Sequence, residues 1–227
     1  MLPDPPLIQV CGDSAYQITF SENIDPSSNL KVYQLDRWLN LNQLEGFVEA
    51  IPSYSSLLVL YEPAAVSPAK MVAWINERIN TCSWDQELST RLIEVPVVYG
   101  GIHGVDLEAV AKTHSLTSED VIQRHSQVEY TVAMMGFSPG FVYLSGMDES
   151  LATPRLASPR MNVPPGSIGI AGNQTGIYSI QSPGGWQLIG QTPISLFDPQ
   201  SANPFYFSPG DRIRFKPISL AESGFNA

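Results

Sequence analysis

The sequence predicts an α+β N-terminal domain followed by an all-β domain of the barrel or sandwich type. Within residues 1–90, short apolar runs alternate with two segments whose apolar residues recur at helical spacing. From residue 134 to 199, proline and glycine recur too often for a long helix, because proline removes a backbone donor and glycine permits left-handed backbone. The runs between them are typical of short strands joined by tight turns: FVYL, IGIA, IYSI, WQLI and PISLF.

The N-terminal segments follow the order strand, helix, strand, strand, helix, strand. The first helix is predicted over residues 26–44, and the second begins at Ser67 and Pro68, because proline suits the first helical turn. This order resembles a small split βαβ domain. We therefore predict two domains, 1–90 and 91–227, with the boundary between Thr81 and Gly104. The predicted strands of this part are 7–10, 15–20, 47–51, 56–61 and 91–99.

Two short helices are predicted next, over residues 105–114 and 117–127. The second opens with Thr117, and Asp120 follows three residues later, which is a capping-box pattern. Residues 128–136 return to a strand pattern. A turn and a last strand are predicted within residues 205–218.

The composition argues against several classes of partner. The 227-residue chain has a formal net charge of −10 and no cluster of Lys and Arg, so we expect neither nucleic acid nor a membrane as a partner. No apolar run is long enough to cross a bilayer, and the first residues lack the pattern of a secretion signal. Cys11 and Cys82 are too few for a disulfide framework. We therefore expect a cytoplasmic protein with reduced thiols.

The charge pattern singles out one segment of the predicted all-β domain. Between residues 150 and 197 there is no Asp and no Glu, although the segment carries Arg155 and Arg160. We call residues 150–197 the arginine segment. A guanidinium presents a planar fork of donors that suits a carboxylate or a phosphate, and the neighbouring prolines stiffen its loop. The segment predicts a surface that faces an anionic ligand or a partner protein. The alternative is that both are ordinary surface arginines.

Other motifs identify no site by themselves. His103, His114 and His125 recur at spacings of eleven residues, but they fall on different predicted elements, and no nearby Cys, Asp or Glu completes a known metal-ligand spacing. We predict no metal site. The run GIAGNQTG, at residues 169–176, lacks the Lys-Ser/Thr pair and the following helix of a phosphate-binding loop. His125 ends a predicted helix, where the helix dipole alone favours a His.

Longer motifs carry a family resemblance. The run GFSPGFVYLSGMDESLATPRLASPRMNVPPGSIGIAGNQTGIYSIQSPGGWQLIGQTPISLFDP resembles the allophanate hydrolase subunit 1 family, which includes the B subunit of 5-oxoprolinase and the KipI-type inhibitor of a sporulation histidine kinase. YGGIHGVDLEAVA and VIQRHS extend the likeness upstream, over residues 96–217. One departure is visible, since Val105 stands before Asp106 where the family pattern leads us to expect a Pro.

The resemblance implies a cyclophilin-like β-barrel and a function that needs further protein components. It implies the B subunit of an ATP-dependent 5-oxoprolinase, which works with the C subunit (the allophanate hydrolase subunit 2 type) to open 5-oxoproline to glutamate, together with the A subunit. ATP would bind in the assembled complex, because this chain has no nucleotide motif. A KipI-type inhibitor that binds a histidine kinase is the alternative. A prolyl isomerase is a third interpretation that rests on fold analogy alone.

The resemblance and the arginine segment together select the candidate site residues. We predict His125 and Arg160 as catalytic residues, because an imidazole titrates near neutrality and a guanidinium can hold an anion. The predicted substrate is a small carboxylate or amide. The predicted substrate-binding residues are Arg155, Gln174, Tyr178 and Trp186.

Overall fold

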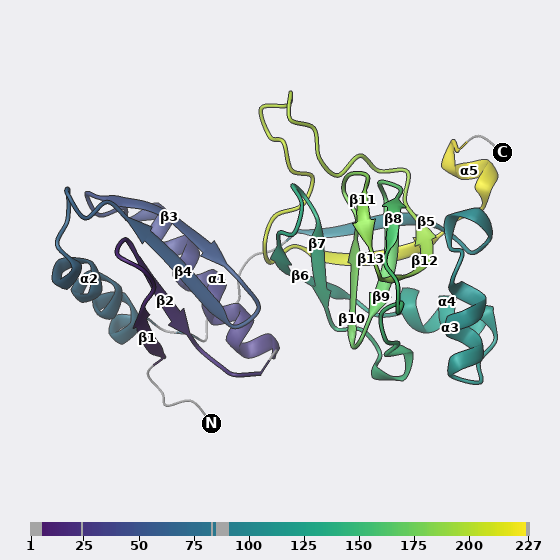
Figure 1. The fold of residues 1–227 in the computed structure, drawn as a ribbon, viewed down its shortest axis with the longest axis horizontal. Helices are drawn as coiled ribbons and strands as arrows, with labels where there is room; N and C mark the ends of the chain where they lie inside the picture. Colours follow the sequence, from purple (N-terminus) through teal and green to yellow (C-terminus); the bar gives the residue numbers. More distant parts are fainter. Residues whose placement is uncertain (1–5, 24, 83, 85–90, 226–227) are drawn as a thin grey trace. The chain divides into compact units, whose positions relative to one another are not determined.

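The computed structural model describes residues 6–23, 25–82, 84 and 91–225. The chain divides into two compact units, Met1–Ser89 and Thr90–Ala227, whose elements are labelled in Figure 1. Each unit has its own hydrophobic core. No helix in the described ranges combines the length and the apolar character needed to cross a membrane.

The first unit is an antiparallel sheet packed against helices. Its described strands follow the order β1-β2-β4-β3, and both β2 and β3 are antiparallel to β4, so β2 and β3 run in the same direction on either side of it. Helix α1 (Pro26–Leu41) joins β2 to β3. This connection has the arrangement of a split βαβ unit. The strands are β1 (Leu7–Val10), β2 (Ala15–Thr19), β3 (Phe47–Pro52) and β4 (Ser56–Tyr61), and helix α2 (Pro68–Thr81) follows them.

Local side-chain chemistry explains where these helices begin. The Asp25 carboxylate accepts a hydrogen bond from the Ser28 N–H at 2.8 Å, and Ser67 caps α2 in the same way through the Lys70 N–H. Each helix has proline in its first turn, where the missing N–H costs nothing. Helix α1 ends at Leu41, three residues earlier than predicted, because Asn42 leaves the helical conformation there.

The second unit is a closed barrel. Seven of its described strands close in the order β10-β7-β6-β13-β5-β12-β9 (Figure 1), so the predicted barrel is confirmed. Strand β5 is parallel to β13 and antiparallel to β12, and therefore belongs to the barrel, although the sequence placed it last in the N-terminal pattern. The barrel strands are β5 (Leu92–Tyr99), β6 (Tyr130–Met135), β7 (Val142–Ser145), β9 (Ser167–Ala171), β10 (Gln174–Ile177), β12 (Gln187–Gln191) and β13 (Arg212–Pro217).

Short helices and a small sheet surround this barrel. Helix α3 (Leu107–Thr113) contacts β12, and α4 (Ser118–Ser126) contacts β13. The predicted capping box of α4 is confirmed, because Thr117 and Asp120 exchange backbone hydrogen bonds. The remaining elements are η1 (Gly101–His103), η2 (Glu149–Leu151), α5 (Leu220–Ser223) and the paired strands β8 (Arg160–Val163) and β11 (Ser182–Gly184).

Three predictions about strands were wrong. The run IYSI is not a strand, since only its first residue, Ile177, belongs to β10. The run PISLF forms only an isolated bridge from Phe197 to Phe205, because the barrel is already closed and Pro193 has no N–H for a ladder. The stiff loop predicted around Arg160 contains strand β8 instead, because β11 supplies a partner that sequence spacing does not reveal.

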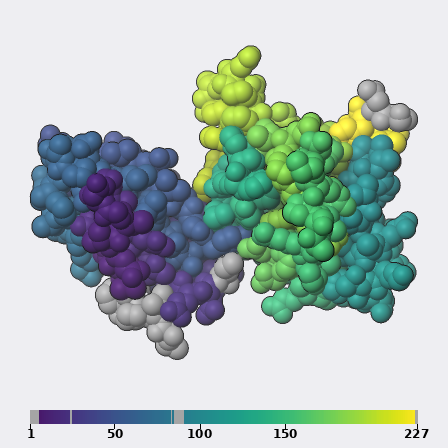
Figure 2. Space-filling model, in the orientation of Figure 1, coloured from purple at the N-terminus to yellow at the C-terminus, as the bar shows by residue number. Residues whose placement is uncertain are grey.

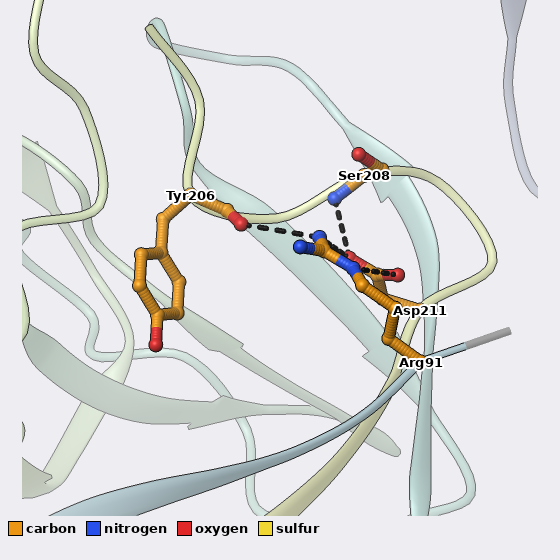
Figure 3. A network of polar contacts seen from close by, with 4 residues as sticks. All are labelled: Arg91, Tyr206, Ser208 and Asp211. Atoms are coloured by element: carbon orange, nitrogen blue, oxygen red, sulfur yellow. Dashed lines mark hydrogen bonds and ion pairs between the residues drawn. The ribbon is translucent and has the colours of Figure 1, made fainter. Parts of the chain in front are cut away.

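Residues 192–211 form an arm between β12 and β13. The arm projects beyond the barrel as a yellow-green lobe in Figure 2. At its base, Arg91 donates to the Asp211 carboxylate and to the Tyr206 carbonyl, and Asp211 also accepts from the Ser208 N–H at 2.8 Å (Figure 3). The side chain of Asp211 is almost fully buried. This network therefore ties the C-terminal end of the arm to the start of β5.

Candidate functional site

The second unit carries a cavity of about 280 Å³ whose walls are aromatic. It lies where the β6–β7 turn, the loop around Arg155 and the β11–β12 connection meet. Among its described lining residues there is no carboxylate, and Arg155 is the one cation. The aromatic residues of its lining are Phe137, Phe141, Tyr143, Tyr178 and Trp186.

The aromatic walls form one packed cluster. The Phe141 ring lies edge-on to Tyr178, with ring centroids 4.9 Å apart, and edge-on to Trp186 at 5.6 Å. Tyr143 also packs against Phe141 and Trp186. Such edge-to-face pairs add stability beyond the burial of their area. The cluster therefore holds the walls of the cavity rigidly while its mouth stays open to solvent.

Two glycines allow this close packing. A Cβ at Gly184 would collide with the Tyr178 hydroxyl, and a Cβ at Gly176 would collide with the Val142 carbonyl and press on the Trp186 ring. Both positions therefore require glycine for space, not for backbone freedom. Burial raises the pKa of Tyr178 above its ordinary value, so this phenol stays protonated and can donate a hydrogen bond at neutral pH.

Phe137 stands at the edge of the cavity in a strained backbone conformation. Its φ is 72°, in the left-handed region that a bulky residue rarely adopts, and its side chain is 65% exposed. Its ring nevertheless packs edge-on against Phe141, 5.7 Å away. The turn between β6 and β7 thus places an aromatic ring at the mouth of the cavity at a cost in backbone strain.

Arg155 is the charged group of the cavity. Its guanidinium carbon lies 6.0 Å from the centroid of the Trp186 ring, which is within the range of a cation–π contact. The described residues give it no carboxylate partner, so its donors face the cavity and solvent. This arrangement suits an anionic group whose remaining atoms can lie against aromatic rings.

The structure brings together half of the predicted site residues. Arg155, Tyr178 and Trp186 all line the cavity. Gln174 does not, because it opens β10 just after the tight turn at Gly172. The roles of these residues in substrate binding stay predictions.

Arg160 lies beside the cavity and is already paired. Its Nη2 donates to Asp106 Oδ1 at 2.6 Å, and its Nη1 donates to the Trp186 carbonyl at 3.3 Å. The arginine segment has no carboxylate of its own, but the fold supplies one from the residue before α3. The catalytic role of Arg160 therefore stays a prediction, and its guanidinium is held by protein groups in this structure.

His125 is fully buried in the barrel core and does not line the cavity. Thr175 Oγ1 donates to the Gly169 carbonyl, so it must accept from His125 Nε2, 3.0 Å away. Nδ1 then accepts from the Tyr99 hydroxyl at 2.8 Å. Both ring nitrogens are satisfied in the neutral form, and burial lowers the pKa of His125 to about 3. Proton transfer by His125 stays a prediction, and the surroundings of the ring favour a structural role.

The other candidate motifs occupy separate places. His103 contacts Gln191 and His114 contacts Thr153, so the three histidines do not converge. Within the described residues, no group of three or more His, Cys, Asp or Glu side chains could hold a metal ion. The run at 169–176 forms the hairpin between β9 and β10, with its turn at Gly172.

Sequence reasoning missed three aromatic residues of the cavity and the partner of Arg160. Phe137, Phe141 and Tyr143 all belong to the motif GFSPGFVY, and three aromatic residues in so short a motif were the available signal. Asp106 was missed as the partner of Arg160, because the two lie 54 residues apart in the chain.

Comparison with known proteins identifies the family. A family model described as "Carboxyltransferase domain, subdomain C and D" matches residues 6–207. The chain belongs to this family. Two curated relatives are both named as the B subunit of 5-oxoprolinase. That of Bacillus subtilis (strain 168) is 44% identical over 97% of this chain and 95% of its own length, and that of Escherichia coli O157:H7 is 40% identical over 91% and 93%.

These relatives confirm the predicted membership of the allophanate hydrolase subunit 1 family. Their names also favour the enzyme component over the kinase inhibitor. Among solved structures, that of TTHA0988 superposes with a TM-score of 0.81 at 32% identity and covers 94% of this chain. This chain spans only 40% of the TTHA0988 chain. TTHA0988 is therefore a longer protein in which the matching part is joined to further sequence.

Proposed function

We propose that this chain is the B subunit of an ATP-dependent 5-oxoprolinase, which opens 5-oxoproline to glutamate. The observation that carries the proposal is the aromatic cavity with Arg155 as its cation and no carboxylate among its described lining residues. 5-Oxoproline is a flat five-membered cyclic amide with one carboxylate, and it matches both features. The relatives named as the B subunit of 5-oxoprolinase support the same assignment.

In this proposal the chain binds and orients the substrate. Arg155 receives the carboxylate through its fork of donors, while the ring lies against Trp186 and Phe141. The Tyr178 hydroxyl, kept protonated by burial, is placed to donate to the amide oxygen. The aromatic walls exclude water from one face of the ring, which strengthens each polar contact.

The proposed complex also contains the C and A subunits of the enzyme. The described residues of this chain do not fit ATP, because the glycine-rich run at 169–176 is a strand hairpin and the cavity offers a single cation for a triphosphate. We therefore assign ATP binding to the other components of the complex. The proposal also includes a cytoplasmic location, a cyclophilin-like barrel and two domains, 1–90 and 91–227.

Reconstitution tests the function. The purified A and C subunits together with this chain should form glutamate from 5-oxoproline only when ATP is present, and this chain alone should form none. Absence of ATP-dependent glutamate formation by the full set would refute the proposed function, as would robust turnover by the single chain.

Replacing Arg155 tests the cavity. Arg155→Gln should raise the KM for 5-oxoproline about 10- to 100-fold, because a charge-assisted contact is worth roughly 1.5–3 kcal/mol. The KM for ATP should not change. Arg124→Gln is the matched control, since Arg124 is a surface arginine of the same unit that contacts Ser150. An unchanged KM for 5-oxoproline in Arg155→Gln would place the substrate elsewhere.

A further inference from the structure

One ion pair stands directly behind the wall of the cavity. Asp106 is nearly buried, and its two carboxylate oxygens have different partners. Oδ1 accepts from Arg160, whose side chain is only 28% exposed, and Oδ2 accepts from the Leu188 N–H at 2.6 Å. The Asp106 N–H in turn donates to the Leu188 carbonyl at 2.8 Å. Asp106 thus holds both the N–H and the carbonyl of Leu188.

Arg160 extends this contact to the cavity itself. Its Nη1 donates to the carbonyl of Trp186, two residues before Leu188. The Trp186 indole forms one wall of the cavity, and the Arg155 guanidinium lies over the face of this ring. The backbone on which that indole stands is therefore held at residue 186 by Arg160 and at residue 188 by Asp106. Arg160 belongs to β8, and Asp106 is the residue before α3. Leu188 lies in β12, and Trp186 immediately precedes that strand.

We infer that Arg160 and Asp106 are positioning residues that set the place of Trp186 and, through it, the shape of the cavity. The inference rests on the proposed role of the cavity in substrate binding. It differs from the sequence-based prediction, in which the Arg160 guanidinium meets the substrate itself. A guanidinium can hold a carboxylate and a carbonyl at fixed angles simultaneously, whereas a Lys ammonium acts as a point charge.

A measurement without substrate decides whether Arg160 acts on Trp186. The chain has four tryptophans, so the full-length protein labelled with 5-fluorotryptophan should give four ¹⁹F resonances, and Trp186→Phe assigns one of them. Arg160→Lys should shift or broaden the Trp186 resonance and leave the other three in place. Arg214→Lys is the matched control, because Arg214 pairs with Glu129 on the barrel surface, and it should move none. A Trp186 resonance identical to wild type in Arg160→Lys would overturn the inference.

Asp106→Asn covers the case in which Arg160→Lys does not fold. The amide oxygen can still accept from Leu188, but the charge that holds Arg160 is lost. The Trp186 resonance should move in the same direction as in Arg160→Lys. An unmoved resonance would again overturn the inference.

Kinetics of the assembled enzyme separate positioning from direct contact. Arg160→Lys alone should raise the KM for 5-oxoproline about 3- to 10-fold with kcat and Tm nearly unchanged. In a Trp186→Phe background, Arg160→Lys should raise the KM for 5-oxoproline less than about 2-fold. The effects of two residues that act through one another are not additive. Full additivity would show that Arg160 contacts the substrate directly. A wild-type complex without activity would refute the proposed function, while the ¹⁹F result would still decide this inference.

Discussion

The stability of the barrel should depend on pH through His125. The ring is fully buried, and burial lowers its pKa from 6.5 to about 3. The titratable groups in contact with it are Tyr99 and Tyr130, whose pKa values burial raises, so both stay neutral across the acid range. Between pH 6.5 and pH 3 the unfolded chain therefore binds a proton at this residue that the folded chain does not.

This difference in proton binding determines the sign and the size of the pH dependence of stability. A depressed folded-state pKa means that the stability is fully present above pH 6.5 and declines as the pH falls toward 3. Each pH unit inside the window changes the free energy of unfolding by roughly 1.4 kcal/mol. Between pH 7 and pH 5 the contribution of His125 should therefore fall by about 2 kcal/mol.

The assay compares wild type with His125→Gln. Urea unfolding of the full chain, followed at the ¹⁹F resonance of Trp186, reports on the barrel unit. Wild type should lose about 2 kcal/mol more than His125→Gln between pH 7 and pH 5, because Gln does not titrate. Taking the difference cancels other groups such as Asp36, whose pKa burial raises to about 6.

His114→Gln serves as the control, because His114 contacts Thr153 outside the barrel core, and it should keep the wild-type dependence. A direct NMR titration of the His125 ring gives a second readout that does not depend on the variant's folding. A His125 ring that becomes charged near pH 6 in the folded protein would refute the reasoning.

The remaining predictions concern packing and the arm. Gly184→Ala should lower the free energy of unfolding by about 1–3 kcal/mol and weaken 5-oxoproline binding, because the new methyl collides with the Tyr178 hydroxyl. Gly185→Ala, whose Cβ meets no atom closer than 3.7 Å, should keep the wild-type Tm, and equal Tm values for the two variants would contradict this account. Asp211→Ala should cost about 1–3 kcal/mol in urea unfolding, because the Ser208 N–H and Arg91 lose their acceptor. Lys216→Gln, which removes an exposed 3.9 Å ion pair with Glu94, should cost less than about 1 kcal/mol, and a larger loss than in Asp211→Ala would refute that ranking.

Local chemistry let the sequence predict most of the elements, and a resemblance carried by long motifs indicated the family. The caps at Ser67 and Thr117 bond only to residues a few positions away, so their sequence patterns are sufficient to place those two helix starts. The density of proline and glycine predicted short strands and turns of a barrel or sandwich, and the family resemblance implied the barrel that the structure shows. The long motifs with Arg155, Tyr178 and Trp186 indicated where the cavity would lie.

Tertiary structure alone decided which carboxylate pairs with Arg160 and whether the His125 ring is protonated. Counting charges along the chain leaves Arg160 without a carboxylate, yet the fold brings Asp106 to it across 54 residues, because electrostatic contact depends on distance in space. The same holds for His125, which was predicted at the end of a helix as an imidazole that titrates near neutrality. Packing of α4 against β13 buries that ring on Phe215 and gives each nitrogen a partner. Desolvation then removes the proton that the sequence led us to expect near neutral pH.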